Sequence, residues 1–305
     1  MSATALVAAW AADMLLGDPR RWHPVAGFGR AAEAVEGAVY APSRPRGAAY
    51  AGVLVGLAGL VAELSTRAVR LPRSLVLGAV TWLALGGRSL VREARRIAGY
   101  VERGELAPAR SALPALVGRD TARLEGDAIC RAAVESVAEN TSDAVVGTLL
   151  WGALAGPGGV AAHRAANTLD AMVGNRSARY REFGWAAARL DDLLSWPAAR
   201  ACAALTALCS PLVGGTPRRT WAVLVRDGRA HPSPNAGRME AAFAGALGVR
   251  LGGPLAYGGR AEERPLRGAE GRVPEAADVD RAARLSLAVG AAAAAACAAL
   301  ARVMA

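Results

Sequence analysis

The sequence predicts an all-α protein, a polytopic bundle of membrane helices, and three observations favour this class. Hydrophobic residues make up 53% of the 305 positions. They are mostly Ala, Leu and Val, and together with 35 glycines they form a mixture that suits helices packed closely through small side chains. They also gather in long stretches separated by polar segments, so we expect one membrane-embedded helical domain over residues 1–305.

Six apolar segments are candidate membrane helices, although several are shorter than the ~20 residues that an upright span needs. No basic residue precedes the first segment, so we interpret it as a membrane helix rather than a cleaved signal peptide. The six segments cover residues 3–16, 48–64, 74–87, 144–162, 194–213 and 285–301.

Two of these segments contain residues that interrupt a helix. Gly156 and Pro157 divide the fourth segment, and Pro197 and Arg200 lie in the fifth. Such interruptions are tolerated at membrane depth only where neighbouring protein satisfies the backbone. We therefore expect residues 144–213 to form a re-entrant or buried helical hairpin, which leaves about four true spans.

Two polar segments lie between the apolar ones. Residues 88–131 place acids and arginines at helical spacing, as with Glu93 and Arg96, and this predicts a soluble helical insert. Residues 260–280 are polar and contain Gly and Pro, which predicts a flexible loop before the last helix.

The net charge of +10 comes from arginine, because the chain contains no lysine. These arginines are scattered and mixed with acids, without a basic helix or an aromatic stacking platform, so nucleic acid is excluded as a partner. Membrane lipids and anionic substrates are the expected partners instead. The four cysteines form no CxxC pair and are interpreted as small core residues.

The first polar cluster follows the first apolar segment and contains Asp18, Arg20 and His23. A proline comes directly after Asp18 and another after His23, so both residues are held extended in a stiff turn. The alternative interpretation is helix punctuation next to an interfacial tryptophan.

The second cluster contains Glu135, Glu139, Asn140 and Asp143. In a helix the three acids fall at i, i+4 and i+8, so three carboxylates share one face before an apolar stretch. Their repulsion favours a bound cation, and Mg²⁺ held together with a substrate phosphate fits this pattern. The alternative is a solvated acidic face that ends in an Asp cap.

The third cluster sets Asn167 and Asp170 one turn apart and then adds three arginines. Guanidinium groups in this number suit a phosphate. Asp191 and Asp192 follow Arg189, and only one of two adjacent acids can face a site, so the other is predicted to pair with Arg189. The three arginines are Arg176, Arg179 and Arg181.

The fourth cluster is a rigid loop with two prolines that presents His231, Ser233 and Asn235. The alternative is a loop that only ends helices. A Ser/His/Asp hydrolase is disfavoured, because the sequence contains no G-x-S-x-G elbow.

With these four clusters in view, the chain resembles the CobD/CbiB family of cobalamin biosynthesis, the adenosylcobinamide-phosphate synthases. The resemblance implies a multi-pass enzyme of the cell inner membrane that joins adenosylcobyric acid to (R)-1-amino-2-propanol O-2-phosphate, or a related amino alcohol phosphate, through an amide bond. It also implies association with other membrane enzymes of cobamide assembly. The matching stretches are GDPRRWHPV, ESVAENTSDAVVGTLLW, RAANTLDAMVGNRSARYREFGWAAARLDDLLSWPAAR and RDGRAHPSPNAGRMEAAFAGALGVRLGGPLAYGG.

The resemblance also suggests roles for the residues of the four clusters. Glu135, Glu139, Asp143 and Asp170 would hold Mg²⁺ and the transferred phosphates, with Glu139, Asp143 and Asp170 as the metal ligands. His23 or His231 would deprotonate the ammonium. The expected substrate-binding residues are Asp18, Arg20, Asn140, Asn167, Arg176, Arg179, Arg181, Asp191, Ser233 and Asn235.

ATP as the activating cosubstrate is implied by the resemblance alone, because the sequence contains no Walker A loop. Two other classes stay open. One is a membrane Mg-dependent transferase acting on an isoprenoid or lipid diphosphate, for which paired Asp-rich motifs would be the signature. The other is a non-enzymatic membrane sensor or transporter, in which alanine at Glu139 or Asp170 would leave corrinoid production intact.

Overall fold

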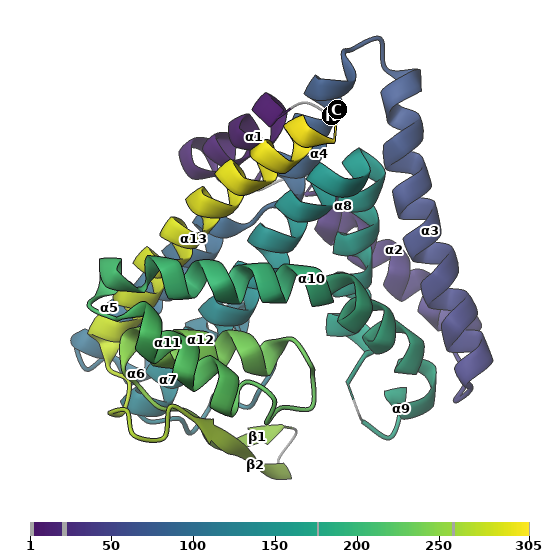
Figure 1. Cartoon of the computed structure of the whole chain (residues 1–305). Coiled ribbons are helices and arrows are strands. Elements are labelled where there is room, and N and C mark those ends of the chain that lie inside the picture. The colour runs from purple at the N-terminus through teal and green to yellow at the C-terminus, as the bar shows by residue number, and fades with distance from the viewer. Residues whose placement is uncertain (1–2, 20–22, 176, 258–259, 305) are drawn as a thin grey trace. The chain divides into compact units, whose positions relative to one another are not determined.

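The computed structural model describes residues 3–19, 23–175, 177–257 and 260–304 (Figure 1), and helices dominate it. The all-α class predicted from the sequence is confirmed, apart from one β-hairpin. The elements are α1 Ala3–Leu16, α2 Pro24–Val39, α3 Arg44–Ala68, α4 Arg73–Ala84, α5 Gly87–Glu102, α6 Leu106–Ala112, η1 Leu113–Ala115, α7 Gly126–Asn140, η2 Thr141–Val146, α8 Gly147–Val173, α9 Tyr180–Phe183, α10 Trp185–Cys209, η3 Ser210–Val213, α11 Pro217–Asp227, α12 Ala236–Leu247, β1 Leu251–Tyr257, β2 Arg260–Arg267 and α13 Ala276–Val303.

The chain divides into two compact units, each made of segments that are distant in sequence. Unit 1 contains Met1–Gly86, Asp143–Ala198 and Ala293–Ala305. Unit 2 contains Gly87–Ser142 and Ala199–Ala292. Three of the four boundaries between the units, at 142/143, 198/199 and 292/293, fall inside helical segments, and the fourth falls at Gly86 and Gly87 between α4 and α5.

In unit 1, α3 packs along α8 and α1 packs on α4. Glycines bring α3 and α8 together, because a Cβ on Gly59 would meet the Gly158 carbonyl oxygen at 3.2 Å. Aromatic rings pack together near the N-terminal end of α3, where the Tyr50 and Phe183 ring centroids lie 5.0 Å apart.

In unit 2, α5 packs against α6 and α7, and α11 packs against α12. The helical structure predicted for residues 88–131 is confirmed over most of this range, and Glu93 pairs with Arg96 at 2.5 Å. Helix α5 is amphipathic, with apolar residues at helical spacing on its buried face. These buried residues are Leu90, Val91, Ala94, Ile97 and Ala98.

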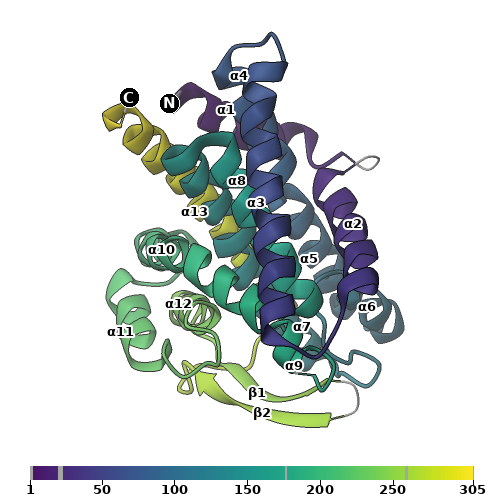
Figure 2. The same ribbon diagram turned by 90° about the vertical axis from the view of Figure 1, so that its right-hand side faces the viewer.

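The polar segment 260–280 differs from the predicted flexible loop. Strand β2 pairs antiparallel with β1, and the two strands lie side by side in Figure 2. Helix α13 then begins at Ala276, inside the predicted loop. The sequence pattern does not indicate the hairpin, because the hairpin depends on tertiary contacts. In one of them the Gly252 N–H donates to Glu135 Oε1 at 2.7 Å.

Five helical stretches among the described residues are long and apolar enough to cross a membrane, and α1 is a shorter apolar helix. The chain is thus a polytopic membrane protein. The break predicted at Gly156 and Pro157 is confirmed, since Gly156 leaves the helical conformation at φ 63° inside α8. The five stretches are Arg44–Ala68, Arg73–Glu102, Gly126–Val173, Trp185–Val213 and Ala276–Val303.

Candidate functional site

Among the described residues we consider two clusters of buried and half-buried polar side chains, one in each unit. We call the first the unit 2 cluster. It takes two glutamates from α7, a third from α12, one histidine from the loop before α12, and two arginines from β2. Its members are Glu135, Glu139, His231, Glu240, Arg264 and Arg267.

Three groups of the unit 2 cluster lie very close together. One ligand atom each from Glu139, His231 and Glu240 falls within 4.8 Å of the others. Glu139 and His231 were both predicted as site residues, and the structure brings them together. Glu240 was not among the predicted site residues, although it lies nine residues after His231 in a matching stretch.

Two arginines, one buried and one half-buried, offset the charge of these acids. Arg267 is 0% exposed and pairs with Glu240 at 3.0 Å, and it also donates to the Ala230 carbonyl oxygen at 2.8 Å. Arg264 Nη1 lies 2.5 Å from His231 Nε2. A carboxylate buried without such partners would be strongly unfavourable, so the arginines stabilise the cluster.

Burial and charge set the protonation of the cluster. Burial, and then the charges of Arg264 and Arg267, lower the pKa of His231 to about 4. The imidazole is therefore neutral at pH 7, with Arg264 Nη1 against its Nε2 and the Ser233 N–H donating to its Nδ1. Burial, and then the carboxylates of Glu139 and Glu135, raise the pKa of Glu240 well above that of an ordinary glutamate.

Glu135 joins α7 to the surrounding chain. Its Oε2 accepts from Arg119 at 2.6 Å and its Oε1 accepts from the Gly252 backbone at 2.7 Å. The carboxylate is nearly inaccessible, with its side chain 3% exposed. Through these contacts Glu135 positions the β-hairpin beside α7.

We call the second group the unit 1 cluster, and Asn167 on α8 lies at its centre. The Asn167 amide nitrogen lies 3.5 Å from Asp143 Oδ2 and 3.4 Å from Asp191 Oδ1. Asn167 Oδ1 accepts from Arg164 at 2.8 Å, and the carboxylates of Asp143, Asp191 and Asp18 act electrostatically on Arg164. The structure thus brings together four predicted site residues that are distant in sequence.

A buried chain of contacts extends this cluster. Ser195 donates to Asp191 Oδ1 at 3.3 Å and lies 3.4 Å from His163 Nε2. Sequence reasoning missed His163, Arg164 and Ser195. Helical spacing was the available signal, because His163 precedes Asn167 by four residues and Ser195 follows Asp191 by four.

Asp192 and Asp170, the remaining acids of the third sequence cluster, have contacts of their own. Asp192 pairs with Arg189 at 3.7 Å, which confirms that one of the two adjacent acids is a partner of Arg189. Asp170 lies near the end of α8, where a Cβ on Gly174 would collide with its carboxylate.

Two of the predicted phosphate-binding arginines already have carboxylate partners. Arg179 donates to Glu36 at 2.9 Å and stacks 4.3 Å from the Tyr40 ring centroid. Arg181 lies 3.7 Å from Glu182 and is otherwise exposed. Arg20 and Arg176 lie outside the described residues.

The polar residues of the proline loop mainly shape the loop itself. Ser233 Oγ accepts from the backbone N–H of Asn235 at 3.2 Å, and the Ser233 N–H donates to His231 Nδ1 at 3.0 Å. Asn235 Oδ1 accepts from Arg200 at 2.6 Å. These contacts fix the orientation of the His231 ring.

Asn140 and His23 take up positions at the ends of helices. Asn140, near the end of α7, donates to the Ser136 carbonyl oxygen at 3.0 Å. His23 directly precedes α2, with Pro24 at its first position, as expected for a stiff turn.

The two clusters differ in the metal ions that they suit. Glu139, His231 and Glu240 include an imidazole, whereas Mg²⁺ prefers oxygen ligands, and Arg264 already lies against the imidazole nitrogen. The unit 2 cluster therefore fits Mg²⁺ poorly. Asp143 Oδ2 and Asp191 Oδ1 lie within 3.5 Å of Asn167 Nδ2 and supply only oxygen, so in ligand type this pair fits Mg²⁺ better, with the positive charge of Arg164 also acting on it.

The fold and the two clusters define a class: a polytopic helical membrane protein with buried acid–base groups typical of an enzyme. The chain matches the CobD/Cbib protein family over residues 6–286, and it belongs to that family. This confirms the family predicted from the four sequence stretches.

Relatives from several bacteria share most of the chain. It is 52% identical to the cobalamin biosynthesis protein CobD of Mycobacterium tuberculosis strain H37Rv, over 92% of this chain and 90% of the relative. Identity to the proteins of the same name is 43% for Chromobacterium violaceum, over 90% of this chain and 88% of the relative. It is 40% for Rhodobacter capsulatus, over 92% and 91%. No solved structure matches the chain.

Proposed function

We propose that the protein acts in cobalamin biosynthesis as an adenosylcobinamide-phosphate synthase. It would join adenosylcobyric acid to (R)-1-amino-2-propanol O-2-phosphate, or a related amino alcohol phosphate, through an amide bond. The observation that carries this proposal is the family match over residues 6–286, which includes all four polar clusters of the sequence.

The proposed reaction needs a base and an activated acid. An ammonium group is not nucleophilic until it loses a proton, and a free carboxylate has a poor leaving group. We assign the proton acceptor to His231, whose imidazole is neutral at pH 7, and in this assignment Arg264 moves away from Nε2 when the amine substrate binds. The amine nitrogen would then attack the carbonyl carbon of an acyl phosphate, and phosphate would leave with the electrons of the C–O bond.

In this proposal ATP forms the acyl phosphate, and Mg²⁺ would offset the phosphate charge during the transfer. We assign Mg²⁺ to Asp143 and Asp191, which differs from the set Glu139, Asp143 and Asp170 expected from the sequence. Support comes from the two carboxylate oxygens that converge within 3.5 Å of Asn167 Nδ2.

We also propose the cell inner membrane as the location, with other membrane enzymes of cobamide assembly as neighbours. The five apolar helices support a membrane location. The alternative transferase of isoprenoid or lipid diphosphates has weaker support, because Asp191 and Asp192 point to different partners and do not form a paired acidic motif.

The test uses purified full-length protein with adenosylcobyric acid, the aminopropanol phosphate and Mg²⁺, with and without ATP. We expect adenosylcobinamide phosphate by mass only when ATP is present. Product without any nucleotide would contradict the activation scheme, and no product in either sample would contradict the proposed reaction.

The adjacent acids of α10 provide a matched pair of variants. Asp191→Asn should lower the rate at least tenfold and raise the Mg²⁺ concentration needed for half-maximal rate, because it removes one proposed ligand. Asp192→Asn should retain near-normal rates, because Asp192 pairs with Arg189. Equal losses in the two variants would contradict the assignment of Mg²⁺ to Asp191.

A further inference from the structure

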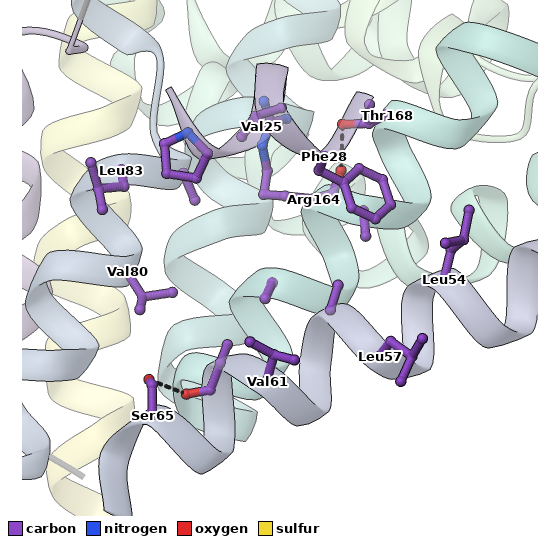
Figure 3. A pocket seen from close by; sticks show the side chains of 16 residues that line it. Val25, Phe28, Leu54, Leu57, Val61, Ser65, Val80, Leu83, Arg164 and Thr168 are labelled. Carbon is purple, nitrogen blue, oxygen red and sulfur yellow. Dashed lines mark hydrogen bonds between the residues drawn. The ribbon is translucent and has the colours of Figure 1, made fainter. Parts of the chain in front are cut away.

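Unit 1 contains an apolar groove between α2, α3, α4 and α8 (Figure 3). Its volume is about 490 Å³, within the range of ordinary ligand sites. The polar residues in its lining are Ser65, Arg164 and Thr168. The two hydroxyls donate to backbone carbonyls of their own helices, those of Ala62 and Arg164.

Arg164 lines the groove and carries one donor that no described residue satisfies. Its Nη1 donates to Asn167, but its Nε is buried and has no hydrogen-bond partner among the described residues. Nearby carboxylates, including those of Asp143 and Asp191, already offset its charge. The missing partner is therefore an acceptor oxygen rather than a second negative charge.

The groove opens on the side of α3 that suits contact with lipid. Leu57 and Val61 line the groove and are 50% and 65% exposed. Val53, Leu60 and Leu64 on the same helix are also exposed. A row of exposed large apolar side chains on a membrane helix is stable when acyl chains surround it.

The length of the groove also fits a lipid tail. Its lining on α3 runs from Leu54 to Ser65, which is about 16 Å at a rise of ~1.5 Å per residue. One leaflet contributes half of a hydrocarbon core that is ~30 Å thick. The lining thus spans about the depth that one acyl chain occupies in a leaflet.

We propose that this groove binds one acyl chain of a membrane glycerophospholipid, and that a small shift of the Arg164 side chain then lets its buried Nε donate a hydrogen bond to the ester carbonyl oxygen. The site recognises the chain and its ester, and it is indifferent to the charge of the headgroup. The groove adjoins the unit 1 cluster through Arg164, but the proposal and its labelling test do not depend on the amide-forming reaction.

The test is photolabelling of the full-length protein in nanodiscs. The probe is phosphatidylcholine with a diazirine on one acyl chain, diluted in phosphatidylcholine, and adducts are mapped by mass spectrometry. Adducts at Phe28 and Leu83, which line the groove, should saturate as the probe fraction rises, with the same result in phosphatidylglycerol. Adducts at Val53, outside the lining, should rise in proportion to the probe.

Two variants fill the groove and one serves as a control. Ala58→Phe and Ala62→Phe replace lining residues and should reduce the adducts at Leu83 several-fold. Ala79→Phe makes the same change at an exposed position of α4 outside the lining, and it should leave them unchanged. If a variant with a filled groove does not fold, the saturation of labelling in the wild-type protein still tests the proposal.

Three outcomes would overturn the proposal. The first is non-saturating labelling at Phe28 and Leu83, which would identify only bulk lipid. The second is labelling that persists in both filled variants. The third is labelling confined to phosphatidylglycerol, which would mean that an anionic headgroup is required.

Discussion

Arg267 is a fully buried guanidinium in a membrane protein with no lysine, and its partners explain how it is accommodated. It lies between Glu240 and the backbone carbonyls of Ala230 and Pro265. Burial of either charge alone is costly, whereas the pair with its hydrogen bonds is tolerated.

Replacing one member of this pair should therefore cost more than replacing both. Arg267→Met should lower the free energy of unfolding, but by less than the ~3–5 kcal/mol of a broken buried ion pair, because Glu240, whose pKa is already raised, can take up a proton once its cation is gone. The double variant Arg267→Met/Glu240→Gln should recover part of that loss. The check is denaturant unfolding in detergent, and a double variant less stable than Arg267→Met would contradict the pairing.

The lowered pKa of His231 predicts a pH dependence with a definite sign. Folded His231 stays neutral down to a pKa of about 4, whereas in the unfolded chain it protonates near 6.5. Between these values the unfolded state binds more protons, so stability falls as the pH falls, by up to ~1.4 kcal/mol per pH unit.

The measurement compares wild type with His231→Gln by thermal unfolding in detergent from pH 7 to pH 4. Wild type should lose stability relative to the variant below pH 6.5. The comparison also removes the opposite contribution of Glu240, which is common to both proteins. Parallel curves would show that His231 is not held neutral.

At the level of residues, the sequence predicted which side chains belong to the polar clusters better than it predicted which of them lie side by side. Glu139, His231, Asp143, Asn167 and Asp191 were predicted and do lie in the two clusters. The sequence grouped Glu139 with Asp143 because they lie four apart on one helix, yet each lies in a different unit. Helical spacing defines a shared face, but packing decides which neighbours that face meets.

At the level of elements, α8 contains a conformation that only glycine adopts easily. Gly156 has φ 63° and ψ −154°, in a region where a Cβ is strained. The following Pro157 lacks an N–H and favours a break at the same place. The sequence predicted this interruption because both residues are specific to such backbone geometry.

Gly156→Ala should therefore lower the free energy of unfolding by ~1–3 kcal/mol. The control is Gly56→Ala on α3, where a Cβ would meet nothing within 4 Å and the backbone is helical. The control should be neutral or more stable by up to ~1 kcal/mol. Thermal unfolding of the two variants in one detergent checks this, and equal effects would contradict the strain at Gly156.

The β-hairpin was not predicted from the sequence, and its contacts explain why. Residues 262–264 are charged and exposed or half-buried, which in sequence is typical of a loop. Backbone pairing with β1 and the Gly268 N–H bonded to Asp227 Oδ2 at 2.7 Å hold the segment in place. Such contacts between distant residues leave no periodic signal in the sequence.

At the scale of the whole molecule, the membrane class was predictable because it follows from composition and the length of apolar stretches. The division into two units was not, because each unit combines segments from distant parts of the chain. The polar segment 88–131 does mark the start of unit 2 near Gly87, but the other boundaries lie inside continuous helical segments and leave no signal in the sequence.

The apolar helices predict which treatments extract the protein from the membrane. Five helical stretches among the described residues could each cross a bilayer. The protein should stay in the membrane pellet after washes with high salt and alkaline carbonate, and it should dissolve in detergent. Release by carbonate alone, measured by immunoblot, would contradict integral insertion.

The small hairpin also has a bearing on solubility during synthesis. Exposed strand edges can recruit strands from other chains and nucleate aggregates. Here a proline stands in each strand, Pro254 in β1 and Pro265 in β2, and neither has an N–H to offer an incoming strand. Glu262 and Glu263 add negative charge beside them, so newly made copies should resist joining edge to edge.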